Sequence, residues 1–326
     1  MTLPIDSTTA IAVSSPEDTV LAPPLMLGYW PGGSVCAVAI DHDDQITVIM
    51  RWDRETAAGL PPATAGLARR VAACHLVAYA DAAPGAAMDP ASLLRALATV
   101  EAAGLPLGRV LVAGRDPRGV AWSSLEDAVA GRAWTVTTSH QVAHVASVWG
   151  CAAWEDSRDA YVSDIDPDPG VREQVERAMG HIVSADLDRD AVITRVRDLV
   201  TSDRLEPETV AEVLVGLQDV RVRDTLLWDV MHEEPVMWQR AAQRLAEVVA
   251  AAPDTHVAAP ATVLAILRWQ TGDGSRAVAA VERARRADPD YTLADLVDRC
   301  LAGGMHPEVW RDGLASLRRE ACLRAA

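Results

Sequence analysis

Lysine, asparagine and phenylalanine are missing from this chain of 326 residues, so all 30 of its basic side chains are arginines. The absence of lysine excludes the P-loop, whose lysine contacts the β- and γ-phosphates, and the Schiff-base chemistry of pyridoxal enzymes. It also excludes a protein-kinase ATP site, which needs a lysine on a strand. Any recognition of an anion by this chain therefore depends on arginine.

The three missing residue types share AT-rich codons, whereas alanine, arginine, glycine and valine are abundant. Their joint absence favours the codon bias of a GC-rich genome over selection against lysine alone. Without phenylalanine, the ten tryptophans must supply much of the aromatic core, so we expect most of them to be buried.

The net charge of −16 disfavours nucleic acid and anionic membranes as partners. The five cysteines are scattered and odd in number, which is typical of single thiols in a reducing cytoplasm. We find neither a secretory leader nor an apolar run of roughly 18 residues. The sequence thus predicts a cytoplasmic protein that does not span a membrane.

The first half of the chain predicts an α/β domain over residues 15–160, after a loose leader at 1–14. Ser15 can cap a helix that begins at Pro16, and Gly28 is a typical left-handed terminator for it. Predicted strands cover 34–40, 46–50, 75–80, 109–113 and 119–123, with helices at 63–73 and 90–103. A strand hairpin followed by alternating helices and strands predicts a mixed sheet with flanking helices.

The second half predicts an all-helical domain over residues 171–326, after an Asp-, Pro- and Gly-rich linker at 161–170. Helices are expected at 171–184, 189–201, 207–216, 221–232 and 236–251. The segment 260–294 then has two apolar-faced helices around a Gly-Asp-Gly turn. That spacing is typical of one tetratricopeptide unit, whose small residues let two helices pack closely.

Two segments near the N-terminus together resemble a known family signature. Ser15–Asp18 and Leu27–Val35 are similar to the S-P-x-D and L-G-[FY]-x-P-x-x-S-[LV] patterns of the actinobacterial domain-of-unknown-function 4192 family. Val220–Asp224 resembles a mid-chain element of that family, and Trp269–Tyr291 its C-terminal element. An actinobacterial origin agrees with the codon bias, and the resemblance implies no particular activity.

The chain departs from this family after the Trp122-Ser123 pair. Many members carry a C-x-D-P-x-C-C-P-x-E-G segment there, whereas this chain continues with Ser124-Leu125-Glu126. If that cysteine cluster binds a metal or does redox chemistry in relatives, this chain has lost the function.

The best metal-ligand spacing in the sequence is His140 and His144, four residues apart and so on one helical face. The metalloprotease pattern requires a glutamate where Gln141 stands, and no third ligand is evident. Acidic runs at 164–168 and 186–190 alternate like calcium loops but lack the sixth-position glycine and the twelfth-position glutamate. We therefore expect no metal and no cofactor, with the two histidines as weak candidates.

No nucleophile or phosphate loop stands out in the sequence. Glycines at 28, 32 and 33 lie between a predicted helix and a strand, which is the reverse of a nucleotide-binding loop. Ser34 and Ser123 lack the G-x-S-x-G pattern. Cys74 and His75 are adjacent on a predicted strand and so should point to opposite faces.

Two hypotheses for function remain open. The first is a non-enzymatic interaction or regulatory protein whose helical domain contacts another protein through Trp269, Tyr291 and Trp310. The alternative is a small-ligand-binding protein or enzyme acting on an anionic small molecule, because ligands favour strand carboxyl ends and arginine pairs bind anions. Its candidate residues are Tyr29, Trp30, Ser34, Arg115, Asp116 and Arg118.

Overall fold

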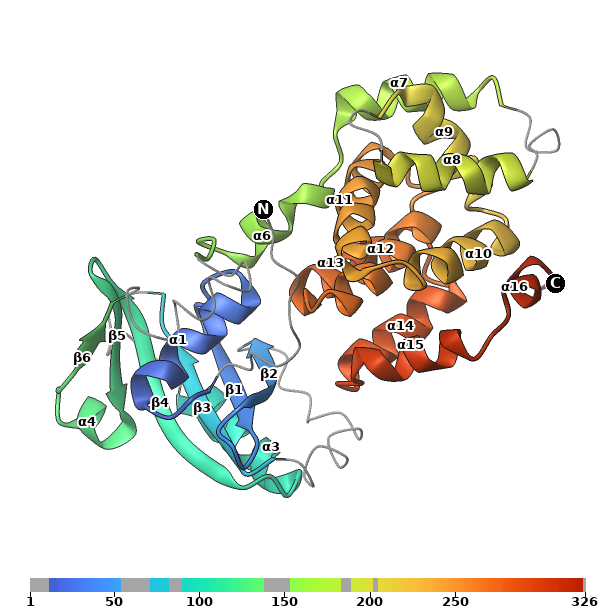
Figure 1. Cartoon of the computed structure of the whole chain (residues 1–326). Coiled ribbons are helices and arrows are strands. Elements are labelled where there is room, and N and C mark those ends of the chain that lie inside the picture. Colours follow the sequence, from blue (N-terminus) through green and yellow to red (C-terminus); the bar gives the residue numbers. More distant parts are fainter. Residues whose placement is uncertain are drawn as a thin grey trace. The chain divides into compact units, whose positions relative to one another are not determined.

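The computed structural model describes residues 12–53, 71–81, 90–137, 153–182, 189–201 and 205–324. It divides into two compact units, Met1–Tyr161 and Val162–Ala326. The first is an α/β unit with a mixed sheet, and the second is helical (Figure 1). Both fold classes were predicted from the sequence.

The first helix, α1 (Pro16–Leu27), has the two ends that the sequence predicted. Ser15 Oγ accepts the backbone N–H of Asp18 at 3.1 Å, and the Asp18 carboxylate accepts the N–H of Ser15 at 2.8 Å, which completes a capping box. Gly28 ends the helix with φ of 81°. A Cβ on Gly28 would lie 2.3 Å from the Tyr161 ring, so both the dihedral and the space require glycine.

The six-stranded sheet has the order β2-β1-β3-β4-β5-β6. Only β3 and β4 are parallel, and all other neighbours are antiparallel. The strands are β1 (Ser34–Ile40), β2 (Ile46–Asp53), β3 (Ala73–Tyr79), β4 (Leu107–Asp116), β5 (Gly119–Ser124) and β6 (Trp134–Val136). β6 and the short helix α4 (Leu125–Val129) were not predicted. The helix predicted at 63–73 lies mostly outside the described residues, and Ala73 itself belongs to β3.

Helices cover both faces of the sheet. On one face, α1 packs its Leu21 and Leu25 against Val77 and Tyr79 of β3. On the other face lies α3 (Pro90–Ala102), whose buried side chains share a core with the alternate residues of the central strands. Because successive strand residues point to opposite faces, β1 and β3 supply both cores.

The helical unit contains ten described helices after the unit boundary. They are α7 (Pro169–Met179), α8 (Arg189–Thr201), α9 (Pro207–Gly216), α10 (Val220–Met231), α11 (Pro235–Ala251), α12 (Ala258–Gln270), α13 (Gly274–Ala287), α14 (Thr292–Ala302), α15 (Pro307–Ala315) and α16 (Arg319–Arg324). Helices α12 and α13 form the predicted pair around the turn at 271–273, and α12 is buried along its whole length. Whether this pair is a tetratricopeptide unit remains a prediction.

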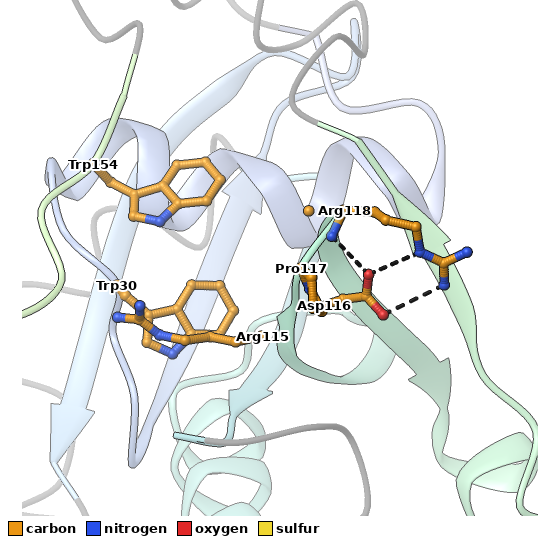
Figure 2. Close-up of a pocket in the computed structure, with 7 residues that line it drawn as sticks. Trp30, Arg115, Asp116, Pro117, Arg118 and Trp154 are labelled. Carbon is orange, nitrogen blue, oxygen red and sulfur yellow. Dashed lines mark hydrogen bonds and ion pairs between the residues drawn. The ribbon is translucent and has the colours of Figure 1, made fainter.

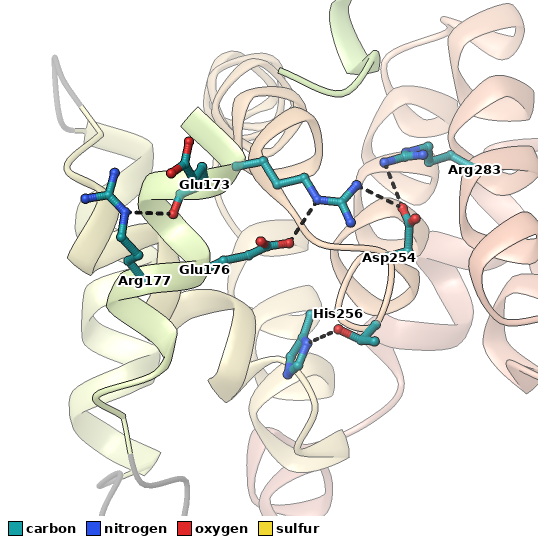
Figure 3. Close-up of polar contacts among 8 residues, drawn as sticks. Glu173, Glu176, Arg177, Asp254, His256 and Arg283 are labelled. Atoms are coloured by element: carbon teal, nitrogen blue, oxygen red, sulfur yellow. Dashed lines mark hydrogen bonds and ion pairs between the residues drawn. The ribbon is translucent and has the colours of Figure 1, made fainter. Parts of the chain in front are cut away.

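Ion pairs connect α7, the α11–α12 loop and α13 within this unit (Figure 3). Arg172 of α7 donates to Glu176 at 3.1 Å and to Asp254 in the loop at 3.5 Å. Arg283 of α13 donates to the same Asp254 oxygen at 3.5 Å. Asp254 is thus a shared counter-ion for guanidinium groups from two helices.

The segment 161–170, for which a linker was predicted, has regular structure in most of its length. Helix α6 (Arg158–Val162) is followed by the 3-10 turn η1 (Ser163–Ile165). Asp168 then caps α7, and its own N–H donates to Ala250 O at 3.0 Å. The Asp-Pro-Gly run that suggested a linker therefore begins a helix here, with Asp168 as its N-cap and Pro169 as its first residue.

Among the described residues, no helix is both long and apolar enough to cross a lipid bilayer. The four described cysteines, Cys36, Cys74, Cys300 and Cys322, are buried. Burial raises the pKa of Cys74 to about 11, so this thiol is protonated at neutral pH.

Candidate functional site

The carboxyl ends of the parallel strands β3 and β4 lie at one edge of the sheet, next to Trp30 in the turn before β1. The Trp30 indole N–H donates to Ala80 O at 3.1 Å, just beyond the end of β3. Its ring meets Tyr79 edge-on with centroids 5.1 Å apart. These contacts fix the orientation of the Trp30 indole, which is almost fully buried.

A segment far along the chain returns to this edge. The N–H of Trp30 donates to Glu155 O at 2.8 Å, and the N–H of Glu155 donates to Gly28 O at 2.8 Å. This short parallel pairing places Trp154 beside Trp30, with ring centroids 6.4 Å apart. Two indole rings from distant segments thus form one aromatic wall.

Arg115, near the end of β4, lies against this wall. Its guanidinium carbon is 5.3 Å from the Trp30 ring centroid, within cation–π range. Nη1 donates to the Asp156 carboxylate at 2.5 Å and Nη2 to the Asp156 carbonyl oxygen at 2.6 Å. The guanidinium is therefore held by a ring face, a backbone carbonyl and a carboxylate.

The β4–β5 turn supplies a second arginine. Asp116 Oδ1 accepts the backbone N–H of Arg118 at 2.9 Å and its Nε at 3.1 Å. These hydrogen bonds lower the pKa of Asp116, so it is ionised at neutral pH. Gly119 ends the turn with φ of 151°, where a Cβ would lie 2.1 Å from Val136 O.

These residues line one open pocket of about 290 Å³ (Figure 2). The lining residues are Trp30, Arg115, Asp116, Pro117, Arg118, Gly119 and Trp154. Four of them were predicted as site residues, whereas Trp154 and the role of Asp156 were missed. No local sequence pattern connects Trp154 to Trp30, because only the returning segment brings them together.

Tyr29 and Ser34, the other two predicted residues, do not line this pocket. Arg51 of β2 donates to Tyr29 OH at 3.1 Å and to Ser34 Oγ at 2.9 Å. Its guanidinium also lies 5.4 Å from the Tyr29 ring centroid, and Tyr161 packs against the same ring. This cluster fixes the start of β1 to the end of β2.

The residues expected to contact a protein partner make contacts within the helical unit. Trp269 is buried and meets Trp310 edge-on, with centroids 6.0 Å apart. Tyr291 OH accepts a hydrogen bond from Arg223 at 2.8 Å. His140 and His144 lie outside the described residues. Within the part of the chain that is described, no three His, Cys, Asp or Glu side chains are close enough to hold a metal.

A family model described as "Domain of unknown function (DUF4192)" matches residues 16–308. The chain belongs to this family. No curated protein and no solved structure is similar enough to match it. In this DUF4192 chain the guanidinium of Arg223 lies over the ring of Tyr291, with 5.7 Å from the guanidinium carbon to the ring centroid.

Proposed function

We propose that this DUF4192 protein binds a small anionic ligand with a planar ring in the pocket at the carboxyl ends of β3 and β4. The observation that carries the proposal is the Arg115 guanidinium held on the face of Trp30 beside a second indole, Trp154. Indole faces stack on planar rings, and a guanidinium pairs with a carboxylate or phosphate.

The size and exposure of the pocket support a small ligand. Its volume of about 290 Å³ is just below the roughly 300–1,000 Å³ typical of ligand sites. Trp154 is half-buried, which leaves part of its ring for stacking, and Arg118 is mostly exposed. A mononucleotide or an aromatic carboxylate matches this combination of ring and charge.

Binding is better supported than catalysis. The seven lining residues include no histidine, cysteine or serine, and the one carboxylate among them, Asp116, is ionised and bonded to Arg118. The described lining of this pocket thus offers no histidine, cysteine or serine for acid–base or nucleophilic chemistry, and its carboxylate is already bonded to Arg118.

A protein-interaction role for the helical unit has less support. Trp269 and Trp310 pack on each other, and Tyr291 is bonded to Arg223, so the three side chains expected at an interface contact their own unit. That role remains a prediction, which affinity capture from a cell lysate at native levels tests.

Thermal-shift and calorimetric titration with AMP, adenosine and ribose phosphate test the ligand proposal. AMP combines a planar base with a phosphate, so it should stabilise the protein more than either fragment. A panel of aromatic carboxylates extends the test to the other ligand class. The proposal is wrong if no member of the two classes raises the melting temperature.

Two tryptophan variants locate the binding. Trp154→Ala removes half of the aromatic wall and should weaken AMP binding about tenfold, as loss of one base–aromatic stack does. Trp134→Ala is the control, because Trp134 is an exposed tryptophan of the same unit that stacks on Trp122, with centroids 5.2 Å apart, and does not line the pocket. Equal effects of both substitutions would place the ligand elsewhere.

A further inference from the structure

Asp156 pairs with Arg115 through two different groups. Its carboxylate accepts from Nη1 at 2.5 Å, and its backbone carbonyl accepts from Nη2 at 2.6 Å. The two bonds differ in how easily they can be exchanged. The carbonyl is part of a backbone segment that is tied down, whereas the Asp156 side chain is 90 % exposed to solvent.

The segment that carries Asp156 does not depend on the carboxylate for its position. Glu155 holds it through two backbone hydrogen bonds, one from the N–H of Trp30 and one to Gly28 O, both at 2.8 Å. The Arg115 guanidinium keeps its own two supports, the Trp30 ring and the Asp156 carbonyl, when the carboxylate turns away. Arg115 would then present Nη1 without a change in the fold.

We propose that the Asp156 carboxylate is an internal competitor, which occupies the place on Arg115 that the ligand's anionic group takes when it binds. This inference rests on the proposed function. Exposed ion pairs contribute little to stability, so a phosphate or carboxylate displaces Asp156 at low cost, and the released side chain is hydrated at once. The affinity for anions is thereby limited, while the affinity for neutral rings is unchanged.

The competition predicts a gain of affinity on removal of the carboxylate. Asp156→Ala should bind AMP about three- to tenfold more tightly than the wild type, because both the competing pair and the repulsion of the phosphate are lost. Adenosine, which has no phosphate, should bind both proteins equally. Asp159→Ala is the matched control, since it removes the same charge from an exposed position in α6 outside the pocket.

Calorimetric titration of wild type, Asp156→Ala, Asp159→Ala and Trp154→Ala with AMP and with adenosine separates the outcomes. A gain confined to Asp156→Ala and AMP supports the inference. If Asp156→Ala binds AMP no better than wild type while Trp154→Ala weakens it, the competition is wrong and the ligand pocket stands. If AMP binds none of these proteins, even with the carboxylate removed, both proposals are wrong for phosphates. Titration of the same four proteins with benzoate then tests both proposals for an aromatic carboxylate, with the same outcomes.

Discussion

His75 of β3 accepts the backbone N–H of Arg109 of β4 at its Nδ1, with 2.9 Å between the two nitrogens. Arg109 in turn donates from Nη2 to Ser14 O at 2.7 Å, next to the capping box of α1. Because Nδ1 accepts, the single proton of the neutral ring is on Nε2, which lies 3.5 Å from Arg109 Nη1. A second proton would require Nδ1 to give up its hydrogen bond beside a permanent cation.

The stability of the α/β unit should therefore fall as the pH drops from 6.5 towards 4. Burial and then the charge of Arg109 lower the pKa of His75 from 6.5 to about 4, with a small opposing effect of Asp44. In this window the unfolded chain binds a proton that the folded protein does not, so acid favours unfolding. The loss should reach about 3 kcal/mol, measured as the free energy of unfolding by urea across the window.

His75→Gln isolates this contribution from that of the many carboxylates. Glutamine keeps a neutral side chain that can accept from Arg109 but does not titrate. The variant should thus lose less stability than the wild type between pH 6.5 and 4, whatever its stability at neutral pH. Parallel pH profiles for the two proteins would contradict a lowered pKa of His75 in the folded state.

Glycine at position 28 should be required for space as well as for its dihedral. Gly104→Ala provides the reference, because Gly104 in the same unit has φ of 67° and open space around its missing Cβ. That variant should cost about 1–2 kcal/mol for the left-handed backbone alone. Gly28→Ala, whose Cβ would lie 2.3 Å from the Tyr161 ring, should cost about 1–3 kcal/mol more for overpacking. Equal costs in chemical denaturation would mean that Tyr161 moves aside freely.

Sequence reasoning was most accurate where the determinants are local. Ser15, Pro16 and Gly28 specify the two ends of α1 through bonds within one or two turns, and the structure confirms both ends. The alternation of Cys74 and His75 is equally local. Cys74 packs in the core on the α3 side, while His75 contacts Arg109 near the start of α1.

The pocket was predictable only in part, because some of its residues are placed by local structure and others by long-range pairing. Arg115 and Asp116 end β4 and Arg118 lies in the turn after it, so the rule for strand carboxyl ends finds all three. Trp154 and Asp156 reach the pocket through backbone pairing with Gly28 and Trp30, and no periodicity or turn signal encodes that pairing. Trp269 shows a different ambiguity, because a tryptophan in a repeat-like helix fits an exposed groove and a buried core equally well.

The segment 161–170 shows what composition alone leaves out. Its residues are typical of a linker, and the boundary between the two compact units falls at its start, yet Ile165 is buried in the helical core. Asp164 accepts from the buried Arg268 of α12 at 2.5 Å. A buried arginine needs a hydrogen-bond acceptor, and the carboxylate of Asp164 supplies one. This long-range pairing fixes η1 to the helical unit.

Removing the two partners of this pair should have unequal costs. Asp164→Ala removes a carboxylate that pairs with Arg268, a residue that is only 4 % exposed. Arg268→Met leaves a carboxylate that is already 38 % exposed and lies 3.7 Å from Arg276. We expect about 2–3 kcal/mol for Asp164→Ala and less than about 1 kcal/mol for Arg268→Met. The double variant should be more stable than Asp164→Ala alone, because no unpaired charge remains buried. A double-mutant cycle by chemical denaturation measures all three values, and a double variant as unstable as the sum of the single ones would contradict the argument.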